Sequence, residues 1–435
     1  MNTLDRDILR LALPSIVSNI TVPLLGLCDV TVMGHVGGAT HIGAISVGSM
    51  IFNVMYWLFV FLRMSTSGLT AQAYGAARWD VTRATLRRGM FMAVTFGVAI
   101  VALQVPLKSL TFWLMQVSGD VEQLCTPYYY TCVWGAPAVL GLYVLSGWFI
   151  GMQDTRVPML IAIGQNVVNI GVTLLLVVVV GMGIEGVALG TLVAQWAGFI
   201  VGLCLVGKVG RRKWKESPAH HLPPASPSSA DKSTIHLDIF LRTVCVVSVN
   251  LYFTSAGAAQ GAPILAANTL LMQFFMIYSF MMDGFANAGE ALAGRYLGAA
   301  DGLMLSRTVH RLFLWGGGIA LAFTAVYALG GPLLLRLLTS DVGVVGVACD
   351  YLPWAVLIPV AGLAAFVWDG IFIGTMRSRG MLVSSFLAAL VFFALWLLLS
   401  SPLGNHALWI ALLSYLAMRG MVQTVIWRRS RDSLI

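Results

Sequence analysis

Long apolar segments separated by short polar stretches run through the whole sequence. Twelve of these segments are about 20 residues long or longer, which is enough for a helix to cross the hydrocarbon core of a membrane. The alternating segments of about ten residues that are typical of membrane β-barrels are absent from the sequence. We therefore predict an all-α integral membrane protein with twelve transmembrane helices. The spans are expected near residues 9–33, 42–66, 89–115, 123–150, 157–181, 184–207, 238–258, 263–291, 312–338, 344–372, 380–400 and 405–426.

The two halves of the chain repeat each other. The string GWFIG at Gly147–Gly151 returns as GIFIG at Gly370–Gly374, and GLTAQAYGAA at Gly68–Ala77 returns as ALAGRYLGAA at Ala291–Ala300. Both pairs are 223 residues apart, which indicates a duplication. We predict two pseudo-symmetric lobes of six helices each, with the same orientation and related by an axis along the membrane normal.

A polar stretch rich in Pro and Ser separates the two halves and is typical of a flexible linker. We place the N-terminal lobe at residues 1–207, a cytoplasmic linker at 208–237 and the C-terminal lobe at 238–435. His220 and His221 lie in this stretch. Two adjacent histidines on such a loop are expected to be solvated rather than to bind a metal.

Composition and charge agree with a membrane protein. The chain is 58% hydrophobic and 10% charged, whereas soluble domains contain about 25% charged residues. The net charge of +8 could suggest a nucleic-acid partner in a soluble protein. Here 21 of the 26 Lys and Arg residues fall on the termini and on alternate loops. This distribution predicts that both termini are cytoplasmic and that no nucleic acid is bound.

Signatures of enzymes and cofactors are missing from the sequence. It contains no H-E-x-x-H, no G-x-S-x-G and no P-loop, and its seven histidines lie in loops or near the ends of spans. The six cysteines form no C-x-x-C pair, so we expect free, buried thiols. The N-terminus lacks a signal-peptide cleavage pattern, so the first helix is expected to remain. We predict no enzymatic activity, no cofactor and no metal site.

Asp29 lies in the middle of the first apolar segment, within LLGLCDVTVMGHVG. Ionisable residues inside membrane spans are costly and by default functional. Burial favours the neutral form of a carboxyl group, so Asp29 is suited to taking up and releasing a proton. Pro14 and Pro23 remove backbone hydrogen bonds from the same helix and make it a candidate hinge. The alternative is a static pair between Asp29 and Arg63 or an asparagine.

Further polar residues form two stripes, in which the residues are three or four positions apart and so share one helix face. The stripes are Asn166, Asn169 and Thr173 in the fifth span, and Asp283, Asn287 and Glu290 in the eighth. Each stripe must face protein or water rather than lipid. Asp283 and Glu290 could instead pair with Arg242 or Arg419, or lie near the cytoplasmic interface. The other polar candidates for the cavity or the C-terminal lobe are Arg63, Gln165 and Asp369.

Five strings resemble those of a transporter family. They are LALPSIVSNITVPLLGLCDVTVMGHVG in the first span, FLRMSTSGLTAQAYGA after the second, DGFANAGEALAGRYLGA after the eighth, DGIFIGTMRSR after the tenth and GNHALWIAL in the last. Over nearly its whole length the chain resembles the multidrug and toxic compound extrusion (MATE) transporters, most closely their DNA-damage-inducible protein F (DinF) branch. The resemblance implies a two-lobed antiporter of the bacterial inner (cytoplasmic) membrane that exports amphipathic, often cationic compounds in exchange for protons or sodium ions.

The resemblance also implies roles for particular residues. Asp29 matches the family's first-span aspartate, which is implicated in cation coupling, Asn169 matches an asparagine near it, and Pro14 matches a proline at which that helix bends. Where many members have a second aspartate this chain has Thr173, which removes one carboxylate from the site. We therefore expect H+ rather than Na+ as the coupling ion. Asp369 matches an aspartate whose role varies among branches.

We predict a secondary active efflux antiporter that works by alternating access, with Asp29, Asn169 and Thr173 as its cation-coupling residues. Its expected partners are a small amphipathic or cationic molecule and the lipid bilayer, and we expect a monomer. The alternative is a lipid-linked saccharide flippase of the same broad superfamily. A large anionic substrate would call for many cations in the cavity, whereas the midplane cations are few, chiefly Arg63 and Arg419. A membrane protein without transport is disfavoured by the duplicated lobes and the paired stripes.

Overall fold

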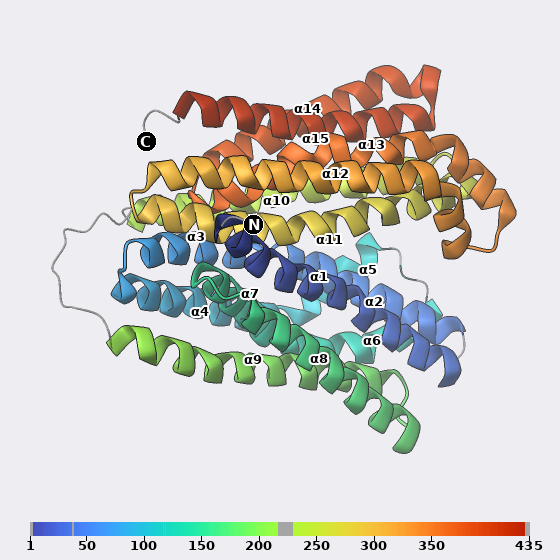
Figure 1. Cartoon of the computed structure of the whole chain (residues 1–435). Coiled ribbons are helices and arrows are strands. Elements are labelled where there is room, and N and C mark those ends of the chain that lie inside the picture. The colour runs from blue at the N-terminus through green and yellow to red at the C-terminus, as the bar shows by residue number, and fades with distance from the viewer. Residues whose placement is uncertain (1–2, 37–38, 116, 118, 216–228, 431–435) are drawn as a thin grey trace. The chain divides into compact units, whose positions relative to one another are not determined.

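The structure, a computed structural model, describes residues 3–36, 39–115, 117, 119–215 and 229–430; within these, the side chains of 22–31, 33–36, 39, 211–215, 229–233 and 430 are not described. All regular secondary structure in the described residues is helical (Figure 1). The N-terminal half contains α1 (Thr3–Val36), α2 (Ala39–Trp57), α3 (Phe61–Gly75), α4 (Trp79–Ala102), α5 (Gln104–Leu114), α6 (Gly119–Cys132), the 3-10 turn η1 (Val133–Gly135), α7 (Ala136–Gly151), α8 (Arg156–Leu174), the π-helical turn η2 (Leu175–Val179) and α9 (Ile184–Lys215). The C-terminal half contains α10 (Ser229–Ala258), α11 (Ala262–Gly298), α12 (Gly302–Leu338), α13 (Val342–Gly374), α14 (Ser378–Leu403) and α15 (Asn405–Ser430).

Eleven helical segments among the described residues are long and apolar enough to cross a membrane. Helix α1 has 34 residues, precedes these eleven and covers the first predicted span. The prediction of an all-α membrane protein is confirmed, and the helix count agrees with twelve spans. Large apolar side chains on the outer faces are exposed, for example Phe91 (74%), Leu329 (89%) and Leu397 (75%). Such faces suit contact with lipid, in which apolar side chains are not excluded as they are in water.

The chain folds into two compact units. One unit is Leu13–Ala225, and the other joins Met1–Ala12 to Ser226–Ile435. Helix α1 therefore contributes its first residues to the C-terminal unit and the rest to the N-terminal unit. Helix α9 reaches Lys215 and α10 begins at Ser229, so helix covers both ends of the stretch predicted as a linker. Residues 216–228, with His220 and His221, lie outside the described residues.

Local geometry repeats between the two halves at the same spacing of 223 residues. Four helices are followed by a residue in the left-handed region although none of these residues is glycine: Ala77 (φ 53°), Gln153 (φ 65°), Ala300 (φ 54°) and Met376 (φ 55°). After each of them, an amide bonds back to the carbonyl five residues earlier, as in a Schellman motif. Arg78 N reaches Ala73 O at 2.8 Å, and the counterpart Asp301 N reaches Tyr296 O at 2.9 Å. The predicted duplication is confirmed by this matching backbone geometry.

The second and fourth spans of the N-terminal half are interrupted where their counterparts are continuous. Helix α2 ends at Trp57 and the chain resumes as α3 at Phe61, whereas α11 runs without a break. The fourth span is likewise built from α6, η1 and α7, whereas α13 is a single helix. The two duplicated halves therefore share one topology, but these spans are broken in the N-terminal half and continuous in the C-terminal half.

The third predicted span, 89–115, was wrong in its placement. Helix α4 begins earlier, at Trp79, and ends at Ala102, and α5 is a separate short helix. Pro106 supplies the physical reason. It has no N–H for the carbonyl of Ala102, so the hydrogen bond that would continue α4 at this point is missing.

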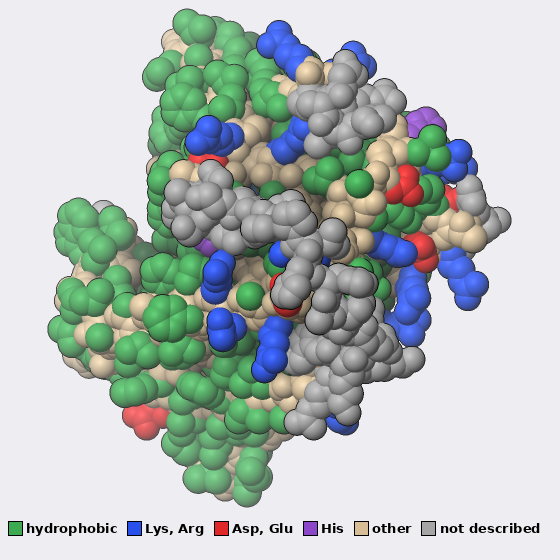
Figure 2. Space-filling model, turned by 90° about the vertical axis from the view of Figure 1, so that its left-hand side faces the viewer, with side chains coloured by type: hydrophobic (Ala, Val, Ile, Leu, Met, Phe, Trp, Pro, Cys, Tyr) green, Lys and Arg blue, Asp and Glu red, His purple; other side chains and the backbone are tan. Residues whose placement is uncertain are grey.

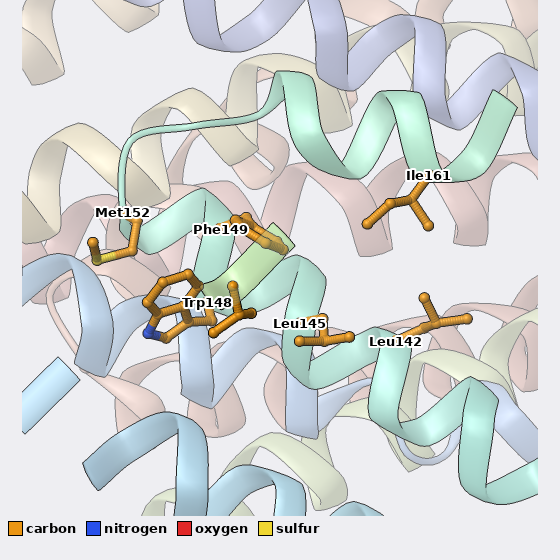
Figure 3. Packing of buried hydrophobic residues seen from close by; sticks show 7 residues of the cluster. Leu142, Leu145, Trp148, Phe149, Met152 and Ile161 are labelled. Atoms are coloured by element: carbon orange, nitrogen blue, oxygen red, sulfur yellow. The ribbon is translucent and has the colours of Figure 1, made fainter. Parts of the chain in front are cut away.

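Helix α7 forms a core of the N-terminal unit. Leu142, Leu145, Trp148 and Phe149 are buried along it, and Ile161 packs against them from α8 (Figure 3). Trp148 is fully buried, and its Nε1 donates to the Thr82 carbonyl on α4 at 3.1 Å. A buried indole needs such a partner for its N–H. This core fixes α7 and α8 relative to each other and so positions the polar residues of α8.

Candidate functional site

The predicted coupling site begins in α1, whose side chains are only partly described. Asp29 and Pro23 belong to this helix, but their side chains lie outside the described residues. Pro14 is half-buried, and the chain is helical on both sides of it. The described geometry of the site therefore comes from the residues that α8 and α9 supply.

The residues of the predicted stripe on α8 contact two different neighbouring helices, α1 and α9. Asn166 Nδ2 donates to the backbone carbonyl of Thr21 on α1 at 2.7 Å. Asn169 Nδ2 donates to Thr191 Oγ1 on α9 at 3.0 Å. Gln165 also faces α9, where its Nε2 lies 3.5 Å from a backbone carbonyl. Helix α8 is thus tied to α1 about two turns before Asp29, and it is tied to α9 on its other side.

Asn169 and Thr173 are fully buried, and one oxygen atom of each, Asn169 Oδ1 and Thr173 Oγ1, has no hydrogen-bond partner among the described residues. Gly190 on α9 makes room for the threonine, because a Cβ atom at this position would lie 2.2 Å from Thr173 Oγ1. Buried polar atoms in native proteins are rarely left unsatisfied. Two such oxygens, one turn apart on α8, can accept a hydrogen bond from a protonated group or coordinate a small cation.

The C-terminal unit contains a buried ionic cluster around Asp369 on α13. Its Oδ2 accepts from Arg242 on α10 and from Arg419 on α15, and its Oδ1 accepts from Gln423 Nε2 at 2.8 Å. All four residues are at most 8% exposed. Two guanidinium groups meet one carboxylate here, so the cluster carries one net positive charge. The arrangement joins three helices through a single side chain.

Sequence reasoning identified only part of this cluster. Asp369 and Arg419 were singled out separately, and Arg242 was considered as a partner for the acids of α11. Gln423 was missed, although it follows Arg419 by four residues and therefore lies on the same face of α15. Periodicity could have found that pair. It could not have shown that α10 and α15 both place an arginine against α13.

The stripe on α11 combines different environments. Glu290 is buried, with 1% of its surface exposed, whereas Asp283 and Asn287 are half-buried. Ser279 Oγ lies 3.4 Å from Asp283 Oδ2, one turn earlier on the same helix. Of the three residues on the predicted shared face, Glu290 is therefore the one that is enclosed.

Glycines allow close helix crossings beside the predicted polar residues. A Cβ atom at Gly147 on α7 would lie 2.3 Å from the carbonyl oxygen of Arg63, and one at Gly374 on α13 would lie 2.4 Å from that of Glu290. Small residues let helix backbones approach each other in this way. Arg63 is half-buried in the first turn of α3, directly after the interruption at residues 58–60.

Comparisons with known proteins identify relatives over the whole chain. The MatE family model matches residues 14–175 and 239–397, once in each half. The chain is 37% identical over 426 residues to "DNA damage-inducible protein F" of Escherichia coli strain K12, covering 98% of this chain and 92% of that protein. It is 25% identical to "Probable multidrug resistance protein NorM" of Caulobacter vibrioides, covering 97% of this chain and 88% of that protein.

Solved structures have the same fold. A crystal structure described as MATE in the bent conformation matches with a TM-score of 0.87 and 19% identity, covering 100% of this chain and 96% of that chain. A transporter of the MOP superfamily from Pyrococcus furiosus, described as having a binding pocket of reverse polarity, matches with a TM-score of 0.86 and 19% identity. That second match covers 100% of this chain and 97% of the other.

Proposed function

The chain belongs to the multidrug and toxic compound extrusion (MATE) family, and from this premise we propose that it is a secondary active antiporter that exports amphipathic or cationic compounds in exchange for H+. Members of the family are efflux transporters of small molecules, and this chain is a multi-pass membrane protein. To this family assignment the proposal adds four points: H+ is the coupling ion, transport occurs by alternating access, the protein lies in the bacterial inner membrane, and both termini are cytoplasmic.

Two buried oxygens in the N-terminal unit support H+ coupling. Within the part of the chain that the structure describes, Asn169 Oδ1 and Thr173 Oγ1 have no hydrogen-bond donor, and α8 contacts α1 through Asn166 and Thr21. A carboxylate only accepts hydrogen bonds, whereas a protonated carboxyl group also donates one. We assign that donor role to Asp29. Proton uptake then satisfies an orphaned acceptor and removes a buried charge, which gives the two states of the site different energies.

The ionic cluster of the C-terminal unit argues against Asp369 as the proton carrier. Protonation of Asp369 would leave Arg242 and Arg419 buried without a counter-charge, and buried unpaired charges are strongly unfavourable. We therefore assign Asp369 to a permanently ionised tie between helices. This removes Asp369 from the carboxylates that could carry the proton.

The proposed cycle follows from these assignments. In the outward-open state Asp29 takes up a proton, α1 bends at its prolines and the bound compound is released. Deprotonation toward the cytoplasm then resets the site, and an organic cation competes with the proton for the same carboxylate. Alternating access requires only that the proton and the compound favour opposite states.

The experiment that tests this proposal uses purified protein in liposomes with either a pH gradient or a sodium gradient. Movement of a fluorescent lipophilic cation is followed for wild type, Asp29→Asn and the control Asp120→Asn. Asp120 is an exposed carboxylate in the first turn of α6. We expect proton-driven movement in wild type and in the control, and its loss in Asp29→Asn.

Two other outcomes would contradict the proposal in different ways. Movement driven by sodium alone would mean either that Thr173 and its neighbours form a sodium site, or that the ion site lies in the C-terminal unit around Asp283, Glu290 or Asp369. Absence of movement with either gradient, in folded wild-type protein, would favour the lipid-linked saccharide flippase.

A further inference from the structure

A groove on the outer surface of the N-terminal unit lies between the beginning of α4 and the end of α9. Its volume is about 780 Å³, and its lining includes Arg83, Arg87, Phe91 and Val94 from α4 and Leu203 from α9. None of these residues takes part in the proposed transport site. We propose that this groove binds an anionic phospholipid, with the headgroup at the arginines and an acyl chain along the apolar part.

The polar end of the groove has the charge that an anionic headgroup requires. Arg83 and Arg87 are both exposed and lie four residues apart, so they project from the same face of α4. Asp80 is the acidic residue in the lining and leaves one net positive charge. Figure 2 views the end of the molecule where α4 begins and α9 ends, and it shows Lys and Arg side chains beside hydrophobic ones. Arginines at the cytoplasmic boundary between transmembrane helices are typical of sites for anionic headgroups.

The apolar end continues in the direction that an acyl chain would take. Phe91 is 74% exposed, Val94 44% and Leu203 42%. Val94 follows Arg87 by seven residues, which places it about 10 Å farther along the helix axis and deeper into the span. The same strip of surface therefore changes from cationic to apolar with depth, as a phospholipid changes from headgroup to chain.

The combination of a cationic end and an apolar end favours an anionic phospholipid over other ligands. An organic cation would be repelled by the arginines, and a small inorganic anion would make no use of the exposed apolar residues. A zwitterionic phospholipid would fill the apolar part but would gain less from the net positive charge. An anionic phospholipid satisfies both ends of the groove.

The test is native mass spectrometry of the purified full-length protein, titrated in detergent with phosphatidylglycerol or with phosphatidylcholine. The variant Arg83→Gln/Arg87→Gln removes both headgroup contacts. The control Arg428→Gln/Arg429→Gln removes the same charge from exposed arginines at the end of α15, outside the groove. We expect the groove variant to bind phosphatidylglycerol about tenfold more weakly and the control to bind it as wild type does.

A second variant tests the apolar part of the groove. Phe91→Ala retains both arginines, and we expect it to weaken the binding of phosphatidylglycerol as well. Thermal unfolding without added lipid shows that each variant is folded. Three outcomes would each overturn the proposal. The groove variant and the control could bind more weakly to the same extent, or wild type could bind the two lipids equally. Inorganic phosphate alone could also displace phosphatidylglycerol. All of these readouts are independent of transport.

Discussion

At the scale of single residues, Asp369 gives the clearest energetic prediction. It holds the buried guanidinium groups of Arg242 and Arg419 and accepts from Gln423. Asp369→Asn would leave two buried cations without a counter-charge. Breaking a buried ion pair from one side costs about 3–5 kcal/mol, so we expect the free energy of unfolding to fall by about that amount. Unfolding in mixed detergent micelles measures the change.

Two further variants separate charge from packing in this prediction. Asp350→Asn removes an exposed carboxylate from the same helix and should change stability little. Adding Arg242→Gln and Arg419→Gln to Asp369→Asn removes all three charges and should recover most of the loss. If the single variant were as stable as wild type, the cluster would not be an energetic tie between helices.

The residues of this cluster also show what the sequence could not provide. Each charged member was visible as a polar residue in an apolar span, because hydropathy exposes such residues directly. Their mutual contacts join α10, α13 and α15, which are far apart in the sequence. Periodicity describes one helix at a time, and it contains no information on which helices become neighbours. Arg242 was for this reason considered as a partner for the acids of α11.

At the scale of helices, the glycines at the crossings are predicted to be intolerant of substitution. A Cβ atom at Gly147 would lie 2.3 Å from the backbone oxygen of Arg63, and one at Gly370 would lie 2.2 Å from that of Ala286. Backbone atoms cannot rotate away as a side chain can. We expect Gly147→Ala and Gly370→Ala each to destabilise the protein by about 1–3 kcal/mol, the usual range for overpacking.

Glycines on two other helices offer controls with the same substitution. A Cβ atom at Gly164 on α8 or at Gly317 on α12 would meet no described atom of another part of the chain within 4 Å. Alanine is favoured over glycine inside helices by about 1 kcal/mol, so these substitutions should be neutral or stabilising. Thermal unfolding of the four variants is the measurement. Equal effects at crossing and open positions would show that the helices can separate at little cost.

A helix boundary could be predicted from the sequence only where a helix-breaking residue such as proline is present. Pro106 explains the end of α4, and the predicted third span ran past it because the apolar pattern continues. Residues 58–60, between α2 and α3, are Leu, Phe and Val and contain no helix-breaking residue. The matching part of α11 is continuous. This interruption therefore depends on tertiary packing, which hydropathy does not encode.

At the scale of the whole molecule, the repeat made the architecture predictable. A spacing of 223 residues relates the sequence strings, the left-handed residues and the glycine crossings. Helix α1 departs from this simple division, because Met1–Ala12 belongs to the C-terminal unit and Leu13 onward to the other. No sequence signal marked this exchange. It follows from contacts such as that of Asp5, which accepts from Trp315 Nε1 at 3.2 Å and pairs with Arg311 at 3.7 Å.

Because the first residues of α1 belong to the C-terminal unit, we predict that α1 keeps the two pieces of the chain associated after the chain is cut between the units. A protease site inserted between Ala225 and Ser226 would allow the folded protein to be cleaved at the boundary of the two units. We expect the pieces to remain associated in gel filtration, because the first twelve residues stay within the C-terminal unit. A hydrogen bond to a charged group contributes about 1.5–3 kcal/mol, so Asp5→Ala should weaken the association about tenfold or more. Asp7→Ala, two residues farther on and half-buried, should have a smaller effect. Association that is insensitive to Asp5 would show that α1 does not carry it.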